Sequence, residues 1–311
     1  MNPHREQHAE RAALATRAAL ASVGVAFLLL GLKSWAAWST HSMAMLGSLA
    51  DTGLDLIASL VTLAGVRIAA VPADSDHRFG HGKAEALVAL FQTVLITLSA
   101  GWIGYRSVER LVAGAETGSA ELGIGVSLVA MGATVLLILY QRHVVARTGS
   151  VAIAADRAHY QSDLLLNVSV IMALILDQFA GLVGADGVFG LFIAVWLLVG
   201  AWRASSHAID QLMDREWPEE KRTAFLAAAA EHPELAGLHD LRTRTSGSNH
   251  FVQFHVWVPA HWTVRHAHDR IDVVDEALQL RFPGTEILIH LDPDGHTDRE
   301  TMLPSTITEK H

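Results

Sequence analysis

The chain has 311 residues, of which 51% are apolar or aromatic and only 18% are charged, against roughly 25% charged in soluble domains. Most of its net charge of −9 lies after residue 209, and an acidic balance disfavours a nucleic-acid partner because phosphate binding needs clustered Lys and Arg. The chain contains no cysteine, which excludes disulfides, thiolate metal sites and cysteine-based catalysis, whereas its 18 histidines leave imidazole chemistry open.

Six segments are long and apolar enough to cross a bilayer, which takes about 20 mostly apolar residues. A short N-terminal tail, residues 1–13, precedes them. We expect the transmembrane domain over 14–209, with spans at 14–38, 43–70, 86–111, 122–140, 158–179 and 188–209. Lys and Arg concentrate in the tail and loops that face inward if the N-terminus is cytoplasmic. Six crossings then place the C-terminus in the cytoplasm as well.

The second and fifth spans are the least apolar because both carry carboxylates. Asp51 and Asp55 in the second span, and His159 and Asp163 in the fifth, are each spaced i, i+4, so each pair leaves its helix on one face. Inserting an Asp near a helix centre costs about 2.5–3.5 kcal/mol, so such residues are rarely kept without a role. The alternative is that each Asp is a buried structural residue, hydrogen-bonded to its neighbours.

Divalent metal binding is the chemistry that makes best use of these four residues. Two pairs on facing helices would supply three carboxylates and one imidazole, which can close a tetrahedron around Zn²⁺. A proton can replace the metal, because the ligands bind metal only when they are deprotonated. One site that holds either a metal ion or protons is the minimum equipment of an antiporter.

The short loop after the second span contains further candidate ligands. Asp74, His77 and His81 are offset by three and four residues, and Asp76 is a fourth candidate. Three ligands with an open position are typical of a weaker or transient metal site. The alternative is an ordinary solvated polar loop.

Residues 210–295 read as a small α+β domain with the order α-β-β-α-β, and residues 296–311 read as a flexible tail. We expect the helices and strands, in chain order, at 219–231, 238–245, 250–259, 263–282 and 286–291. Val252, Phe254, Val256 and Val258 alternate with polar or aromatic residues, as in a strand buried on one face. The order suggests a two-layer sheet with its helices on one face.

Four segments together resemble the cation diffusion facilitator family, and most closely its bacterial ferrous-iron and zinc efflux transporters. They are residues 50–55, 72–85, 159–163 and 239–244. The resemblance covers nearly the whole chain, from the first span to about Pro293. It implies a homodimer in the bacterial cell inner membrane, with six spans in the lipid bilayer, a metallochaperone-like cytoplasmic domain, and exchange of metal for protons by alternating access.

The resemblance also implies three metal sites and one charge pair. Carried over by motif, the transport site is Asp51, Asp55, His159 and Asp163, and the loop site is Asp74, His77 and His81. The cytoplasmic two-metal site at the dimer interface is His239, His255, His268, His290 and Asp292. Leu291 stands where close relatives carry a polar residue, which puts a full binuclear site in doubt. Lys83 and Asp214 match charges that interlock the membrane and cytoplasmic parts; the alternative is two unrelated interfacial charges.

These features predict a proton-coupled antiporter that exports divalent cations, Zn²⁺ first and then Fe²⁺, Cd²⁺ or Co²⁺. The metal would be both substrate and regulatory ion, without a prosthetic group. A membrane metalloenzyme is a weaker reading, because it needs an open metal position with a general base, and no His-Glu-x-x-His motif is present. A membrane-embedded metal sensor without flux would use the same ligands and stays the alternative.

Overall fold

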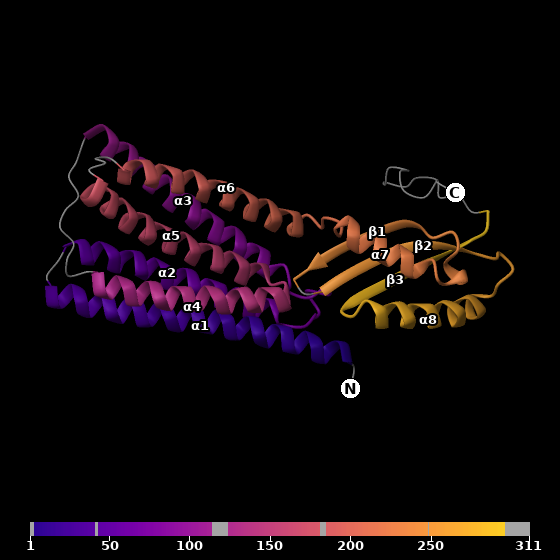
Figure 1. Cartoon of the computed structure of the whole chain (residues 1–311). Coiled ribbons are helices and arrows are strands. Elements are labelled where there is room, and N and C mark those ends of the chain that lie inside the picture. The colour runs from indigo at the N-terminus through magenta and orange to yellow at the C-terminus, as the bar shows by residue number, and fades with distance from the viewer. Residues whose placement is uncertain (1–2, 41–42, 114–123, 181–184, 248, 296–311) are drawn as a thin grey trace. The chain divides into compact units, whose positions relative to one another are not determined.

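The computed structural model describes residues 3–40, 43–113, 124–180, 185–247 and 249–295. The chain divides into two compact units, Ala9–Ile209 and a second unit of Met1–His8 with Asp210–His311. The first unit is helical and the second is built around a sheet (Figure 1). The predicted tail at 296–311 lies outside the described residues.

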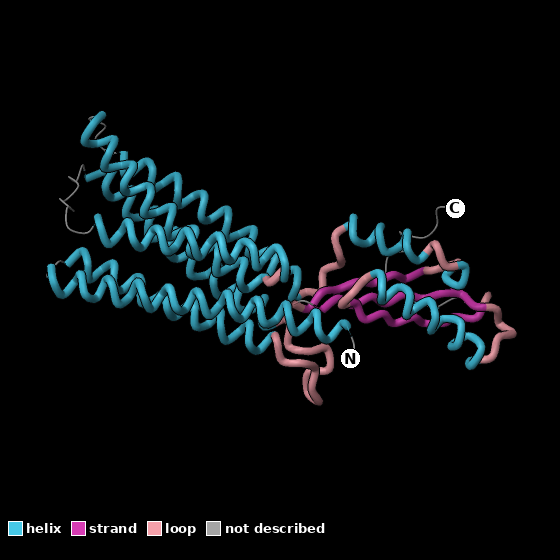
Figure 2. Tube along the Cα trace, turned by 60° about the horizontal axis from the view of Figure 1, so that its bottom comes forward, coloured by secondary structure: helices cyan, strands magenta, loops and turns pink. Residues whose placement is uncertain are grey.

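Six long helices form the first unit, as the apolar segments predicted, and they lie alongside one another in Figures 1 and 2. They are α1 (Pro3–Thr40), α2 (Met43–Ala69), α3 (Ala84–Ala113), α4 (Ile124–Thr148), α5 (Val151–Ala180) and α6 (Ala185–Leu212). Three boundaries differ from the prediction by seven residues or more, one of them the end of α4, which lies at Thr148, eight residues after the predicted end. Helix α1 already begins at Pro3, within the predicted tail, and α5 begins seven residues before the predicted span.

Five of these helices are long and apolar enough to cross a membrane, namely α1, α2, α3, α4 and α6. Over its described residues α5 does not meet the same measure. The first half of α5 contains Asp156, Arg157 and Asp163, which lower its hydropathy. Charged side chains inside a helix bundle are tolerated when they face its interior and find partners there. The chain is therefore a multi-pass membrane protein whose fifth helix contains the buried residues Asp156 and His159.

Helix α5 packs against α2, α3 and α4 and so has a central place in the bundle. Its first turns, at Ala152 and Ile153, are fully buried in an apolar cluster with Ala18 and Val144 from other helices. Small residues let helix backbones approach closely. A Cβ atom added at Gly65 of α2 would collide with Val88 of α3, so glycine is required at that crossing.

The second unit contains the five predicted elements and one short 3₁₀ helix that was not predicted. They are α7 (Glu219–Ala229), η1 (Pro233–Leu235), β1 (His239–Ser246), β2 (Asn249–Val258), α8 (Val264–Arg281) and β3 (Thr285–Pro293). The sheet order is β1-β2-β3, with β1 antiparallel and β3 parallel to the central β2. The α-β-β-α-β order predicted from the sequence is confirmed.

Alternation along β2 assigns its two faces. Phe254 and its even-numbered neighbours are buried in one core with Phe225 of α7 and Leu278 of α8, so both helices cover the same face of the sheet. The odd-numbered side chains point to the opposite face, because successive residues of a strand alternate. His255 and Trp257 lie on that open face. The fold therefore sets the histidines of the strands apart from the apolar core.

Candidate metal centres

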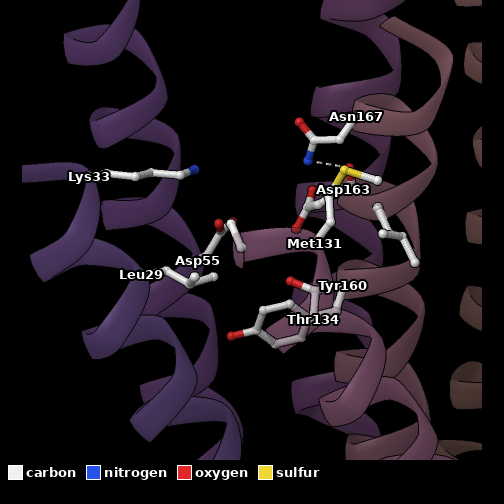
Figure 3. Close-up of a pocket in the computed structure, with 10 residues that line it drawn as sticks. Leu29, Lys33, Asp55, Met131, Thr134, Tyr160, Asp163 and Asn167 are labelled. Atoms are coloured by element: carbon white, nitrogen blue, oxygen red, sulfur yellow. Dashed lines mark hydrogen bonds between the residues drawn. The ribbon is translucent and has the colours of Figure 1, made fainter. Parts of the chain in front are cut away.

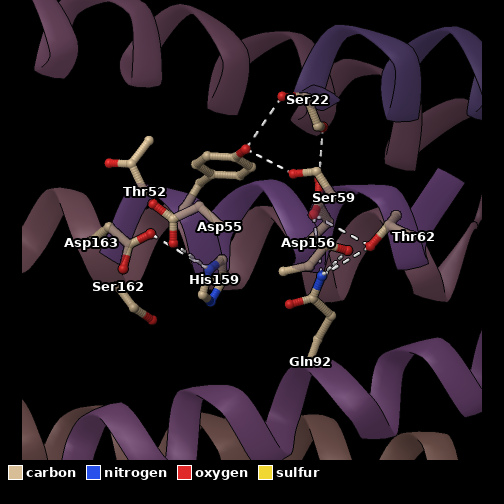
Figure 4. A network of polar contacts seen from close by, with 12 residues as sticks. Ser22, Thr52, Asp55, Ser59, Thr62, Gln92, Asp156, His159, Ser162 and Asp163 are labelled. Atoms are coloured by element: carbon tan, nitrogen blue, oxygen red, sulfur yellow. Dashed lines mark hydrogen bonds and ion pairs between the residues drawn. The ribbon is translucent and has the colours of Figure 1, made fainter. Parts of the chain in front are cut away.

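The first cluster of candidate ligands joins α2 to α5 within the helical unit. Asp55, His159 and Asp163 each offer a ligand atom, and these atoms all lie within 4.8 Å of one another. His159 Nε2 lies 3.1 Å from Asp55 Oδ1 and 3.7 Å from Asp163 Oδ2 (Figure 4). Asp163 Oδ2 is buried and has no hydrogen-bond partner among the described residues. A buried oxygen without a donor suits a bound cation, since leaving it unpaired is costly.

Asp51, the fourth ligand expected at this site, is not part of the cluster. It lies one helical turn before Asp55 on α2 and is exposed in the structure, whereas Asp55 is partly buried. The i, i+4 spacing places both carboxylates on one side of the helix. That spacing leaves open how far the side of α2 carrying Asp51 turns toward α5. In the arrangement described, α5 approaches the carboxylate of Asp55 alone.

A pocket beside this cluster contains one charge that the sequence reasoning missed. It is lined from four helices by Leu29, Lys33, Asp55, Ala130, Met131, Thr134, Tyr160, Asp163, Leu164 and Asn167 (Figure 3). Lys33 Nζ donates to Thr52 Oγ1 at 2.7 Å and to the Ser48 carbonyl at 3.4 Å. The signal was available, because a cation inside an apolar span is itself a sign of function.

Asp156 is a second buried carboxylate that the sequence reasoning did not single out. Its side chain is fully buried, and its Oδ2 accepts hydrogen bonds at 2.7 Å from both Ser22 Oγ and Gln141 Nε2. Its Oδ1 accepts from Gln92 Nε2 at 3.2 Å and Thr62 Oγ1 at 3.4 Å (Figure 4). The donors belong to α1, α4, α3 and α2. Asp156 therefore connects α5 to four other helices, three residues before His159.

Glu85 fixes the beginning of α5. It lies in the first turn of α3 and is buried, and its Oε2 accepts from Ser150 Oγ at 2.7 Å and from the Val151 amide at 2.9 Å. The first amides of a helix lack partners within the helix, and a carboxylate placed there also interacts favourably with the helix dipole. The start of the ligand-bearing helix is thus tied to the start of α3.

The second cluster lies in the loop between α2 and α3, where the sequence predicted it. The ligand atoms of Asp74, His77 and His81 all lie within 4.8 Å of one another. Asp74 is 3.3 Å from His77 Nδ1 and 3.4 Å from His81 Nε2. The backbone amides of His77 and Asp76 both donate to the Asp74 carboxylate. These hydrogen bonds, chiefly the one from His77, keep the pKa of that carboxyl below its usual value. Asp76 itself is not part of the cluster.

The third cluster lies on the open face of the sheet in the second unit. His239, His255 and His290 are cross-strand neighbours, since His255 pairs with His239 on β1 and with His290 on β3. Asp292 is 2.8 Å from His255 Nδ1, 3.4 Å from His239 Nε2 and 3.3 Å from His290 Nε2. The ligand atoms of His239, His255 and Asp292 lie within 4.8 Å of one another.

The Asp292 carboxylate is the shared centre of this third cluster. Burial by itself would raise its pKa, but the hydrogen bond with His255 and the charges of the surrounding imidazoles outweigh it and hold that pKa below the ordinary value. A deprotonated carboxylate among imidazoles is the donor set that Zn²⁺ and similar ions bind. The residues present therefore fit a metal ion on the open face.

Three further predicted residues lie outside these clusters. His268 is exposed on α8 and is not part of the cluster of His239, His255 and Asp292. Asp214 has a left-handed backbone, with φ of 54°, and forms an ion pair with Arg244 at 3.6 Å. The Lys83 carbonyl accepts from Ala86 and Leu87 at the start of α3. The interlock of Lys83 with Asp214 remains a prediction.

Fold and sites together define a multi-pass membrane protein that carries acid–imidazole clusters both within its helical bundle and outside it. Comparison with known proteins identifies the family. Residues 19–213 match the family described as "Cation efflux transmembrane domain", and residues 217–294 match "Cation efflux protein, cytoplasmic domain". The chain belongs to the cation efflux family, a family of transporters, as the resemblance in its sequence had implied.

Curated relatives extend over nearly the whole chain. The chain is similar to "Cation-efflux pump FieF" of Cronobacter sakazakii, with 41% identity over 280 residues, covering 90% of this chain and 93% of that protein. The protein of the same name from Pectobacterium atrosepticum is 40% identical over 293 residues, covering 94% and 95% of the two chains. That from Escherichia coli is 40% identical over 287 residues, covering 92% and 95%.

Proposed function

We propose that this protein is a proton-coupled antiporter that exports divalent transition-metal cations from the cytoplasm by alternating access. Zn²⁺ is the first candidate substrate, followed by Fe²⁺, Cd²⁺ and Co²⁺. The observation that carries the proposal is the group of Asp55, His159 and Asp163 inside the membrane-spanning bundle, with ligand atoms within 4.8 Å of one another. The names of the relatives, cation-efflux pumps, favour transport over catalysis.

The ligand chemistry supports exchange of metal for protons. Two carboxylates and an imidazole offer three of the four donors that Zn²⁺ takes, and Asp51, one turn away on α2, is the candidate for the fourth. The ligands bind metal in their deprotonated forms and take up protons when it leaves. A shift of α2 relative to α5 that brings Asp51 to the site would couple metal binding to rocking of the bundle.

The other two clusters are proposed as regulatory metal sites of a homodimer in the inner membrane, with both termini in the cytoplasm. Asp74, His77 and His81 are mostly exposed, which suits a transient site that exchanges metal with solvent. The cluster on the open face of the sheet lies in the part of the chain matched to the cytoplasmic domain. Metal bound there would stabilise the dimer and favour the export cycle.

Flux through a sealed membrane tests the proposal. The purified chain in proteoliposomes should move Zn²⁺ when a pH gradient is imposed, and dissipating that gradient should stop net movement. Asp55→Ala removes a ligand and should abolish transport. Glu109→Ala is the matched control, because Glu109 is an exposed carboxylate of α3 paired with Arg106. Transport by Asp55→Ala at the wild-type rate would overturn the proposal.

The same proteoliposomes distinguish a transporter from a metal sensor and show which metal ion is the preferred substrate. Metal binding without flux in the unmodified protein would identify a metal sensor instead of a transporter. A competition series with Fe²⁺, Cd²⁺, Co²⁺ and Mn²⁺ against Zn²⁺ ranks the substrates, which ligand type by itself does not do.

A further inference from the structure

Lys33 is a cation within a membrane-spanning helix. It belongs to the apolar span Ala9–Ser39 of α1. Lys33 lies six residues before the end of that span, and charged residues within membrane spans are rare and commonly mark ion pathways. Neither the three ligand clusters nor the network around Asp156 includes it.

The ammonium group of Lys33 is held next to the transport site by neutral oxygens. It donates to Thr52 Oγ1 at 2.7 Å and to the Ser48 carbonyl at 3.4 Å. Thr52 is fully buried on α2, between Asp51 and Asp55 in the sequence. Figure 3 shows Lys33 extending from α1 into the pocket that Asp55 and Asp163 also line. The charge is thus fixed beside the carboxylates while leaving their oxygens to a ligand.

The number of charges at the proposed transport site indicates a role for Lys33. Among the side chains of the proposed site, Asp51, Asp55 and Asp163 contribute three negative charges when deprotonated, and a neutral His159 contributes none; the Asp156 carboxylate is satisfied apart from the site by four neutral donors. The single positive charge of Lys33 leaves a net charge of −2, which one divalent cation cancels. In a medium of low polarity an uncancelled charge is expensive, so a neutral loaded site moves through the bundle most easily.

We propose that Lys33 is a tethered counter-charge that matches the transport site to one divalent cation and keeps its affinity low enough for release. This makes Lys33 a specificity-determining residue of the transport reaction. The inference rests on the proposed function, because it takes the cluster of Asp55, His159 and Asp163 as the transport site. It adds that the affinity of that site is set by a residue of α1 that does not ligate the metal.

Removing the charge should therefore tighten binding and slow turnover. In proteoliposomes, Lys33→Gln should lower the KM for Zn²⁺ by about tenfold, because a repulsion between the ammonium and the metal disappears. Its Vmax should fall at least severalfold, because the loaded site keeps one negative charge. Lys33→Met, neutral and apolar, should give the same shifts, and Lys33→Arg should restore values near those of the unmodified protein.

Arg17→Gln is the matched control. Arg17 is an exposed cation of the same helix, 16 residues away from Lys33, or about 24 Å along the axis. Its loss should leave both KM and Vmax unchanged. A KM that stays constant or rises in both Lys33→Gln and Lys33→Met, while Asp55→Ala still abolishes transport, overturns the counter-charge and leaves the proposed function intact. Transport that survives Asp55→Ala overturns the proposed function and this inference together.

Discussion

Asp156 connects more helices than any other side chain described above. Its carboxylate is fully buried and accepts hydrogen bonds from Ser22, Thr62, Gln92 and Gln141, each on a different helix. All four donors are neutral, so the carboxylate is held by hydrogen bonds instead of by an ion pair. Buried donors that lose their acceptor cost about 1–3 kcal/mol each. Asp156 therefore links five helices of the bundle at a position three residues before the candidate ligand His159.

Asp156→Ala should destabilise the helical unit strongly. The substitution removes the acceptor that four donors share and opens a small cavity, so we expect a loss of at least about 3 kcal/mol. Ser22→Ala removes one donor only and should cost about 1 kcal/mol. Thermal unfolding of the protein in detergent measures both. A melting temperature for Asp156→Ala equal to that of Ser22→Ala would contradict the role assigned to the network.

Asp275 on α8 gives a pH-dependent prediction for the second unit. Its Oδ2 accepts from Gln279 at 3.0 Å, whereas its Oδ1 is buried without a hydrogen-bond partner among the described residues. Burial, and secondarily the nearby charge of Asp272, raise its pKa above the ordinary value. The folded state thus binds this proton more tightly than the unfolded state does. The stability from this group is complete below the unfolded pKa of about 3.9 and is lost as pH rises through the folded value.

Asp275→Asn should consequently stabilise the protein at pH 7, by up to about 1 kcal/mol because the group is partly exposed. The gain should shrink as the pH falls toward 4, because Asp275 is increasingly protonated in both states. Melting temperatures of the full chain at the two pH values measure this difference. Asp269→Asn, an exposed Asp of the same helix, is the control and should show no such trend. A gain that is larger at pH 4 than at pH 7 would refute the sign.

At the scale of elements, the beginning of α5 decides where its ligands lie. Ser150 Oγ donates to Glu85 and also accepts from the Ile153 amide at 3.3 Å, so Ser150 caps α5 while Glu85 binds the cap. Helix caps contribute about 0.5–2 kcal/mol each. Because the two side chains act through one another, their contributions should be coupled instead of additive.

A double-mutant cycle tests this coupling. Glu85→Ala and Ser150→Ala should each lower stability by about 1–2 kcal/mol, and the double variant should lose clearly less than the sum. Unfolding of the detergent-solubilised protein provides the energies. Strict additivity would show that Glu85 and Ser150 stabilise α5 independently.

Apolar length and alternation predicted most elements, and the misses have physical reasons. The start of α5 was missed because Asp156 and Arg157 interrupt the apolar run, while in the fold Asp156 is satisfied by side chains from other helices. Strand β2 was predicted well because its alternation reflects burial on one face. The short helix at Pro233–Leu235 was missed because three residues carry no periodic signal.

In the candidate site, too, some features could be predicted from the sequence and others could not. Spacing predicted that Asp55, His159 and Asp163 come together, and their ligand atoms lie within 4.8 Å of one another, since i, i+4 pairs project from one face of their helix whatever its neighbours are. Asp51 lies outside the cluster because of how α2 is rotated relative to α5. The sequence of α2 by itself does not determine that rotation. Lys33 escaped notice because a mostly apolar segment such as 14–38 still qualifies as a span when it contains one or two charges.

At the scale of the whole molecule, acid–imidazole clusters occur in both units, and each belongs to a matched part of the same family. The cluster of the second unit needs no residue from the helical bundle, because β1, β2 and β3 supply all of its side chains. The metal binding proposed for the sheet can therefore be measured apart from transport. The same measurement can test whether a second copy of the chain completes the metal site on the sheet.

Asp292→Asn should weaken metal binding at the sheet, because it removes the negative charge shared by His239, His255 and His290. Zn²⁺ that binds the folded state at 100 times its Kd raises stability by about 2.7 kcal/mol, so added Zn²⁺ should raise the melting temperature of the full chain. Part of that rise should disappear in Asp292→Asn. A full rise in that variant would mean that the sheet does not bind the metal.

His268→Ala separates two ways of building this site. His268 is exposed on α8 and lies outside the cluster within its own chain. If one chain forms the complete site, the Zn²⁺-dependent rise in melting temperature should be the same in His268→Ala as in the unmodified protein. If the homodimer brings His268 of a second copy to the metal, the rise should fall as it does in Asp292→Asn, and the dimer should dissociate at a higher protein concentration. We expect the second result, because the family resemblance places His268 among the predicted ligands, although it is exposed on α8 and outside the cluster of its own chain.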